Sequence, residues 1–172
     1  MAAVISSCGE YRYRLERTIG MFGPVAAVIM VNPSTADAQV DDATIRRVVG
    51  FGKRFGWSRV IVGNVFAFRS TDIGRLALTI DPVGPENSVH LRSIFQEADV
   101  AIAAWGRLGK LPQPLRHEWR NVCAIADGLG SDFKCLGLTK DGQPKHPLML
   151  SYRSELVDWL APKAAASLRE VH

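Results

Sequence analysis

The chain has 172 residues, 47% of them hydrophobic, and a formal net charge of +4 at pH 7. This length fits one domain, residues 1–172, with a core large enough to fold without a metal or disulfide staple. The three cysteines are scattered, the N-terminus lacks a signal-peptide pattern and no apolar run approaches the roughly 20 residues of a membrane span, so we expect a cytoplasmic monomer with no membrane partner.

Strand and helix patterns alternate along the chain. Residues 11–15 alternate polar and apolar side chains and predict a strand, in a hairpin over the sheet edge. Four apolar runs predict strands buried on both faces, as in parallel sheets, at residues 25–31, 59–65, 100–106 and 133–137. Helical spacing and capping residues predict helices at residues 42–55, 86–97, 115–127 and 154–160.

This order of elements predicts an α/β fold. We expect a three-layer α-β-α sandwich around a mostly parallel, four-stranded central sheet, with an added N-terminal strand or hairpin. Ligands of open parallel sheets bind outside the carboxyl ends of the strands. The candidate site therefore lies where polar side chains follow the four buried runs.

The first run ends in Asn32-Pro33-Ser34. Pro33 fixes its own φ and favours an extended conformation at Asn32, which makes the Asn32 side chain stiff. An Asn held in this way holds a water or a polar group of a substrate. The alternative is a turn-forming Asn that satisfies its own backbone, because Asn-Pro and Pro-Ser are ordinary turn dipeptides.

The second run contains Asn64, an amide among apolar residues. A buried amide without partners costs about 1–3 kcal/mol. Its one acceptor and two donors match the edge of a pyrimidine base, although a core Asn bonded to backbone is equally compatible with the pattern. Phe66 and Phe68 follow on alternate positions, where one ring stacks on a planar ligand and the other packs in the core. Arg69 then reaches a phosphate or a carboxylate.

His146 is the one histidine in a loop of Gly, Pro and Lys residues after the last strand, which makes it a candidate for a positioned hydrogen-bond donor, although a loop histidine taken by itself is more often incidental. The apolar residues 148–150 that follow begin a buried helix or form a wedge for a partner. Residues 100–153 hold eight Lys or Arg and four acidic residues, so they carry the whole charge excess. This sector either faces a phosphate backbone or is a solvated surface.

Several other activities lack their sequence signatures. No glycine-rich phosphate loop or Gly-x-Ser-x-Gly elbow is present, which argues against nucleotide triphosphatases, dinucleotide-dependent oxidoreductases and α/β-hydrolases. The acidic residues Asp37, Asp41 and Asp42 are compatible with magnesium binding, but helix capping is the preferred interpretation.

At the level of the whole chain, the sequence resembles an uncharacterised family of bacterial proteins that share four strings. In this chain these strings are Asn-Pro-Ser-Thr-Ala-Asp at 32–37, Asp-Pro-Val-Gly-Pro-Glu-Asn at 81–87, Ala-Trp-Gly at 104–106 and Gly-Leu-Thr-Lys-Asp-Gly at 137–142. The order of the strand-end motifs also resembles that of the uracil-DNA glycosylase superfamily. That superfamily has Asp-Pro or Asn-Pro after the first strand, an Asn at the end of the second, Trp-Gly after a later strand, and His-Pro before a Leu wedge.

The resemblance implies a monofunctional, metal-free enzyme of DNA base-excision repair that flips uracil out of DNA and hydrolyses its N-glycosidic bond. Asn32 and His146 are the implied catalytic residues, positioning the water and donating to the base O2. The implied substrate-binding residues are Asn64, which reads the base edge, together with Phe66, Phe68, Ser34, Pro33, Arg69 and Trp105. Leu150 or Met149 would fill the hole in the duplex, and Lys145 and Lys140 would bind DNA phosphates.

The iron–sulfur cysteines of some members are absent, so we expect no cofactor. Two alternatives remain open: a hydrolase of free nucleosides or modified bases on the same fold, and a non-catalytic nucleic-acid-binding module.

Overall fold

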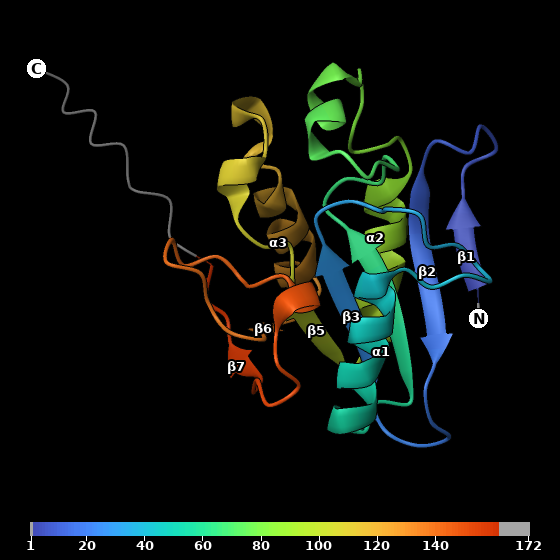
Figure 1. Cartoon of the computed structure of the whole chain (residues 1–172), viewed down its shortest axis with the longest axis vertical. Coiled ribbons are helices and arrows are strands. Elements are labelled where there is room, and N and C mark those ends of the chain that lie inside the picture. The colour runs from blue at the N-terminus through green and yellow to red at the C-terminus, as the bar shows by residue number, and fades with distance from the viewer. Residues whose placement is uncertain (1, 162–172) are drawn as a thin grey trace, which may run out of the picture.

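The apolar runs form strands, and a computed structural model, which describes residues 2–161, joins seven strands within this range into one sheet (Figure 1). Across the sheet the order is β1-β2-β4-β3-β5-β6-β7. In chain order the strands are β1 (Ala2–Ile5), β2 (Arg12–Thr18), β3 (Val25–Met30), β4 (Arg59–Asn64), β5 (Val100–Ala103), β6 (Phe133–Cys135) and β7 (Val157–Asp158).

The four predicted buried strands, β4, β3, β5 and β6, lie side by side in the middle of this sheet and are all parallel. The predicted four-stranded, mostly parallel sheet nevertheless had too few strands. The β1–β2 hairpin, which confirms the predicted N-terminal hairpin, adds to β4 antiparallel, and β7, which was not predicted, adds to β6 antiparallel, so the sheet is mixed. Both additions cover parallel strands that would otherwise be exposed edges, which proteins avoid.

The chain reverses its direction of growth across the sheet at β3. After β3 it crosses to β4 on one side, and after β4 it returns to β5 on the other side of β3. The loops that leave the carboxyl ends of β3 and β5 therefore diverge. A crevice forms at such a switch point, and ligands of open α/β sheets bind there.

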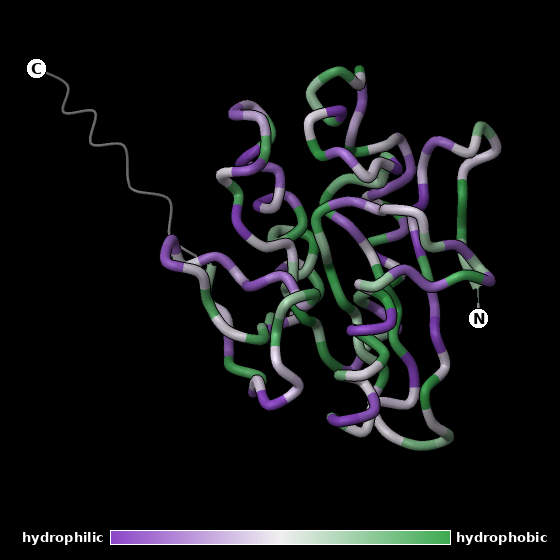
Figure 2. The backbone as a smooth tube through the Cα atoms, in the orientation of Figure 1, coloured by the Kyte–Doolittle hydropathy of each residue, from purple (hydrophilic) through white to green (hydrophobic). Residues whose placement is uncertain are grey.

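Helices cover both faces of the sheet, so the chain has three layers. Helix α1 (Ala43–Phe55) packs Ile45 and Val48 on one face, against Val28 and Val62. Helices α2 (Asn87–Glu97) and α3 (Trp119–Asp127) pack on the opposite face. Figure 2 shows that hydrophobic residues concentrate on the strands in the middle of the molecule, between these helices.

The predicted start of a helix agrees with the structure where a side chain caps that helix. Helix α1 begins after Asp42, one of the two residues, Asp41 and Asp42, that were predicted as its cap, and Asp42 Oδ1 accepts from the backbone N–H of Ile45 at 2.8 Å. The helix predicted at 115–127 begins later, at Trp119. Its predicted start is a separate 3₁₀ turn, η3 (Gln113–Leu115), preceded by η2 (Leu108–Lys110).

The helix predicted at 154–160 is wrong. The segment is extended and contains β7, and the backbone N–H of Trp159 donates to the carbonyl oxygen of Phe133 at 2.8 Å. Its indole packs edge-on against Trp105 and Trp119, with ring centroids 5.0 and 5.7 Å apart. Burial of this ring against β6 outweighs the local helical spacing, because helix propensity is a weak preference.

An ion-pair network ties the added hairpin to α2. Arg14 of β2 is buried and donates to both carboxylate oxygens of Glu97, at 2.7 and 2.6 Å, and to Glu16 at 2.6 Å. The hydrogen bond from Arg14 lowers the pKa of Glu97 to about 2. None of the helices in the described part of the chain is long and apolar enough to cross a membrane.

The Glu97 network predicts an acid-sensitive contribution to stability. Because the pKa of Glu97 falls from 4.5 to about 2 on folding, the contribution is present above pH 4.5 and is lost as the pH falls toward 2. Urea unfolding should show Glu97→Gln to be about 1 kcal/mol less stable than wild type at neutral pH, a modest effect because the carboxylate is partly exposed. The difference in free energy of unfolding between wild type and Glu97→Gln should become smaller on acidification. A difference that stays constant with pH would contradict this prediction.

Candidate functional site

A cavity of about 730 Å³ opens at the switch point, beyond the carboxyl ends of β3 and β5. We call it the switch-point pocket. Val31 follows β3, and Trp105 and Gly106 follow β5. The remaining lining comes from four loop segments: Ile73, residues 107 and 110, residues 138–140, and residues 145–150 without Pro147. The sheet topology thus brings together segments that are far apart in the sequence.

Four cations line this pocket, and no carboxylate does. They are Arg107 and Lys110, which follow β5, and Lys140 and Lys145, which lie in the last loop. The other lining residues are mostly apolar, including Val31, Leu138, Leu148, Met149 and Leu150. A pocket with several cations and apolar walls suits an anionic ligand that also carries a planar or apolar group.

His146 is the one histidine of the pocket, and it is half-buried. Its Nδ1 accepts from the backbone N–H of Leu148 at 3.3 Å, capping the 3₁₀ turn η4 (Pro147–Met149). Burial lowers the pKa of His146, Asp42 raises it and Lys110 lowers it further. His146 is therefore neutral at neutral pH, and because Nδ1 is an acceptor, the proton lies on Nε2, which is a hydrogen-bond donor.

The last loop is fixed to the end of β5 by close packing. Gly106 has φ +82°, and a Cβ added there would lie 3.1 Å from the Cβ of His146. The backbone N–H of Gly106 donates to the carbonyl oxygen of Pro144 at 3.0 Å. The Trp105 indole N–H donates to Oε1 of the buried Gln143, also at 3.0 Å. The Trp-Gly pair thus positions His146.

Trp105 belongs to a cluster of four aromatic rings with Trp119, Phe133 and Trp159. It is almost fully buried and touches the pocket only at its edge. The base-contacting role predicted for Trp105 is therefore limited to this edge, and the residue mainly supports the loop that carries His146.

Asn32 joins two loops. Its amide nitrogen donates to the carbonyl oxygen of Pro33 at 3.1 Å and to that of Ser70 at 2.7 Å. The backbone N–H of Ser70 donates back to the carbonyl oxygen of Pro33 at 2.9 Å. The amide nitrogen of Asn32 therefore bonds to the backbone, as the turn-forming alternative expects. Only its Oδ1 remains available to hold a water.

Asn64 is 1% exposed, and neither its Oδ1 nor its Nδ2 has a partner among the described residues. A Cβ on the neighbouring Gly63 would meet Leu91 and Ile94 of α2. Since side chains alternate along a strand, Asn64 points to the opposite face, the one covered by α1. The alternative of a core Asn bonded to backbone does not apply to its side chain, because a buried unpaired amide remains.

The two phenylalanines after β4 do not reach the switch-point pocket. Phe66 is fully buried in the core, and Phe68 is packed edge-on to Tyr11 with ring centroids 6.0 Å apart. Phe68, Ser34 and Arg69 instead line a second, smaller cavity of about 360 Å³. The predicted site residues thus divide: His146, Trp105, Lys140, Lys145, Met149 and Leu150 share one pocket, Ser34, Phe68 and Arg69 share another, and Asn32, Pro33, Asn64 and Phe66 line neither.

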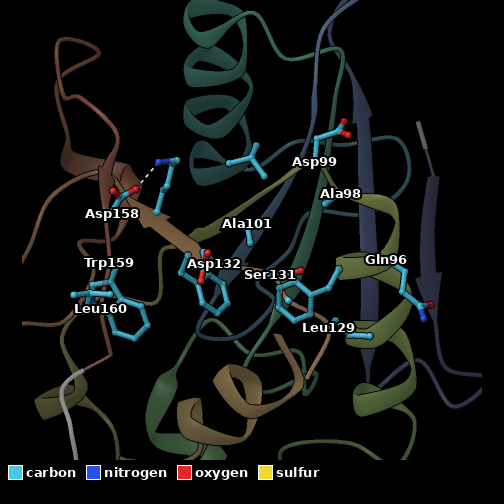
Figure 3. A pocket seen from close by; sticks show the side chains of 15 residues that line it. Gln96, Ala98, Asp99, Ala101, Leu129, Ser131, Asp132, Asp158, Trp159 and Leu160 are labelled. Atoms are coloured by element: carbon cyan, nitrogen blue, oxygen red, sulfur yellow. Dashed lines mark hydrogen bonds and ion pairs between the residues drawn. The ribbon is translucent and has the colours of Figure 1, made fainter. Parts of the chain in front are cut away.

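A third cavity, of about 760 Å³, lies at the opposite end of the sheet, near the starts of β5 and β6 (Figure 3). It is acidic, with Asp99, Asp132 and Asp158, and its one cation, Lys134, donates to Asp158. Its charge and its place at the amino ends of the strands do not suit an anionic ligand. No group of three or more metal-binding side chains is clustered among residues 2–161.

Arg107, Lys110 and Ile73 are pocket residues that the sequence did not single out. Arg107 and Lys110 lie within the basic sector, shortly after Trp-Gly. Their position just past the end of a strand could have identified them as pocket residues. Ile73 begins η1 (Ile73–Leu78), and nothing in its local pattern distinguishes it from a core residue.

Comparison with protein-family models matches residues 12–148 to a family described as "Protein of unknown function (DUF1643)". The match runs from the start of β2 into η4 and covers most of the chain, so the chain belongs to this family. No curated protein and no solved structure matches the chain.

The close approach of Gly106 to His146 predicts that the stability of the protein is sensitive to substitution of Gly106. Gly106→Ala should lower the free energy of unfolding by about 1–2 kcal/mol, because a left-handed backbone is costly for any residue with a Cβ. Gly109 is the matched control, since an added Cβ there meets nothing within 4 Å and its φ lies outside the left-handed region. Equal effects of the two substitutions in urea unfolding would show that neither the left-handed backbone of Gly106 nor its close approach to His146 matters for stability.

Proposed function

We propose that this member of the DUF1643 family is an N-glycosidase that removes uracil from DNA. The observation that carries the proposal is the composition of the switch-point pocket, which holds a neutral histidine with a free Nε2–H among four cations and no carboxylate. Cations suit the phosphates of the substrate, and a neutral donor suits a leaving group that becomes an anion.

The reaction breaks the bond between C1′ of deoxyribose and N1 of uracil. The bonding electron pair leaves with uracil, positive charge develops on the sugar, and a water adds its oxygen to C1′ and releases a proton. The His146 Nε2–H would donate a hydrogen bond to the uracil O2, where negative charge develops. Such a preorganised donor typically contributes 10²–10³-fold in rate.

The buried amide of Asn64 supports recognition of the base. Uracil presents an acceptor and a donor at O4 and N3, and an Asn side chain offers the complementary donor and acceptor. A partner for Asn64 would relieve about 1–3 kcal/mol of unsatisfied hydrogen bonding. Because Asn64 is 1% exposed, the base reaches it only if the side chains above Asn64 move apart. Asn32 Oδ1 would hold the attacking water.

Met149 is the better candidate for the wedge. It is 89% exposed at the end of η4, whereas Leu150 is half-buried. An exposed apolar side chain beside a cationic pocket suits insertion between base steps, which replaces a flipped nucleotide. The arrangement thus supports DNA as the partner, with Lys140 and Lys145 near its phosphates.

A second candidate function is the hydrolysis of a free nucleoside or a modified base. A volume of about 730 Å³ is typical of pockets for small molecules. This candidate requires turnover without DNA, whereas the glycosidase on DNA requires uracil in a strand. A non-catalytic nucleic-acid-binding module would bind DNA equally well after loss of His146.

The direct test is release of uracil from single- and double-stranded oligonucleotides in the presence of a chelator. His146→Ala should slow release at least about tenfold, within the range that such donors contribute. His117→Ala is the matched control, because His117 is exposed outside the pocket. Absence of abasic sites with wild-type protein on both substrates would refute the proposal.

The neutral state of His146 predicts the pH dependence of this activity. Because burial lowers the pKa of His146 below its usual 6.5, release should decline only as the pH falls through this lowered pKa. NMR titration gives the same pKa without substrate. Lys110→Met should raise the pKa, since Lys110 lowers it. A pKa above 6.5 in the wild-type protein would contradict the account.

A further inference from the structure

The smaller cavity at the carboxyl edge of the sheet, which we call the arginine–hydroxyl pocket, has no role in the reaction described above. Its volume is about 360 Å³. Two arginines and four hydroxyl side chains line it: Arg69, Arg75, Ser34, Thr35, Ser70 and Thr71. Glu10 is its one carboxylate, so the cations exceed the acids. Guanidinium groups with hydroxyl donors are the side chains that bind phosphate oxygens in protein–DNA contacts.

Two loops contribute lining residues both to this cavity and to the switch-point pocket. Asn32 joins these loops, where Asn32 and Ser70 are bonded at 2.7 Å and Ser70 and Pro33 at 2.9 Å. Val31 and Ile73 face the larger pocket from these loops, and Ser34 and Ser70 face the smaller one. The two cavities are therefore neighbours along one edge of the sheet.

Two buried arginines of β2 fix the loop that carries the hydroxyl groups of Ser34 and Thr35. Arg12 of β2 is 1% exposed and its Nη1 donates to the carbonyl oxygen of Ala36. Arg17, also buried, donates to the carbonyl oxygen of Asp37 at 2.6 Å and to the Asp41 carboxylate at 2.7 Å. A loop fixed in this way loses little conformational entropy when a ligand binds, which favours affinity.

Arginines outnumber acidic residues among the side chains that line this cavity. Burial lowers the pKa of Arg12 to about 10, Asp42 opposes this shift, and Arg69 and Arg17 lower the pKa further. Arg69 thus lies within electrostatic range of the buried Arg12. Its Nη1 donates to the carbonyl oxygen of Gly9 at 3.1 Å, while its buried Nε has no partner among residues 2–161. Arg75 is exposed at the cavity and free to close on an anion.

We propose that the arginine–hydroxyl pocket binds a backbone phosphate of the strand whose flipped nucleotide occupies the switch-point pocket. The inference rests on the proposed function and deepens it, because a ligand that spans both cavities is a polynucleotide. A free nucleoside or a mononucleotide fills only one of them. Arg75 supplies a charged contact that depends on strand length, and Thr35 and Thr71 supply hydroxyl donors.

The test compares the binding of two ligands, dUMP and a single-stranded, uracil-containing oligonucleotide of about ten nucleotides, which is within the range of single-strand sites. Arg75→Gln should reduce the slope of log K against log salt for the oligonucleotide by about 0.7, the value for one lost phosphate contact on a single strand. Its affinity for dUMP should not change. Arg92→Gln is the matched control, because Arg92 is an exposed arginine of α2 outside both cavities.

Wild-type protein that binds dUMP as tightly as the oligonucleotide would overturn the inference. An Arg75→Gln slope equal to that of Arg92→Gln would overturn it as well. Thr35→Val, which removes only a hydroxyl, should weaken binding of the oligonucleotide and leave dUMP unaffected. These readouts measure binding, so failure of the glycosidase appears separately, as absence of released uracil with the length-dependent binding intact.

Discussion

The close contact between the end of β5 and the last loop is the constraint on which the candidate site depends. A Cβ at Gly106 would lie 3.1 Å from the Cβ of His146, so the two segments approach closely only because residue 106 is a glycine. The Trp105–Gln143 hydrogen bond holds the same loop from the other side. These contacts help to hold His146, in the loop after β6, beside the crevice that the reversal of strand order creates.

Burial and nearby charges then determine the protonation state of His146. His146 is half-buried beside Lys110, and both conditions keep its imidazole neutral. Asp42, the cap of α1, lies within electrostatic range of both His146 and the buried Arg12. A neutral donor among uncompensated cations stabilises a developing anion without itself carrying a charge that the site would have to neutralise beforehand. The arginine–hydroxyl pocket lies at the same edge of the sheet, so cationic side chains line both cavities.

Local patterns predicted what depends on local physics. The four buried strands and the Asp42 cap follow from hydrophobic periodicity and side-chain capping, and the structure confirms them. The extended segment that contains β7 was missed because burial of Trp159 against β6 is a long-range contact. In the candidate site, the Trp-Gly and His-Pro motifs do come together, but the division of Ser34 and Arg69 into a second cavity depends on how the loops pack. Phe66 shows the limit most clearly, since alternation alone does not tell a core ring from a ring that lines a pocket.

The central claim is that Asn64 and His146 contact the same base. The most direct measurement is a titration of ¹⁵N-labelled protein with free uracil, following the side-chain amide of Asn64 and the ring nitrogens of His146 by NMR. The account predicts that both sets of signals shift together at one affinity, while the side-chain amide of Asn121, which is exposed and bonded to Glu118, does not. Shifts at His146 with none at Asn64, or none at either residue at saturating uracil, would contradict it.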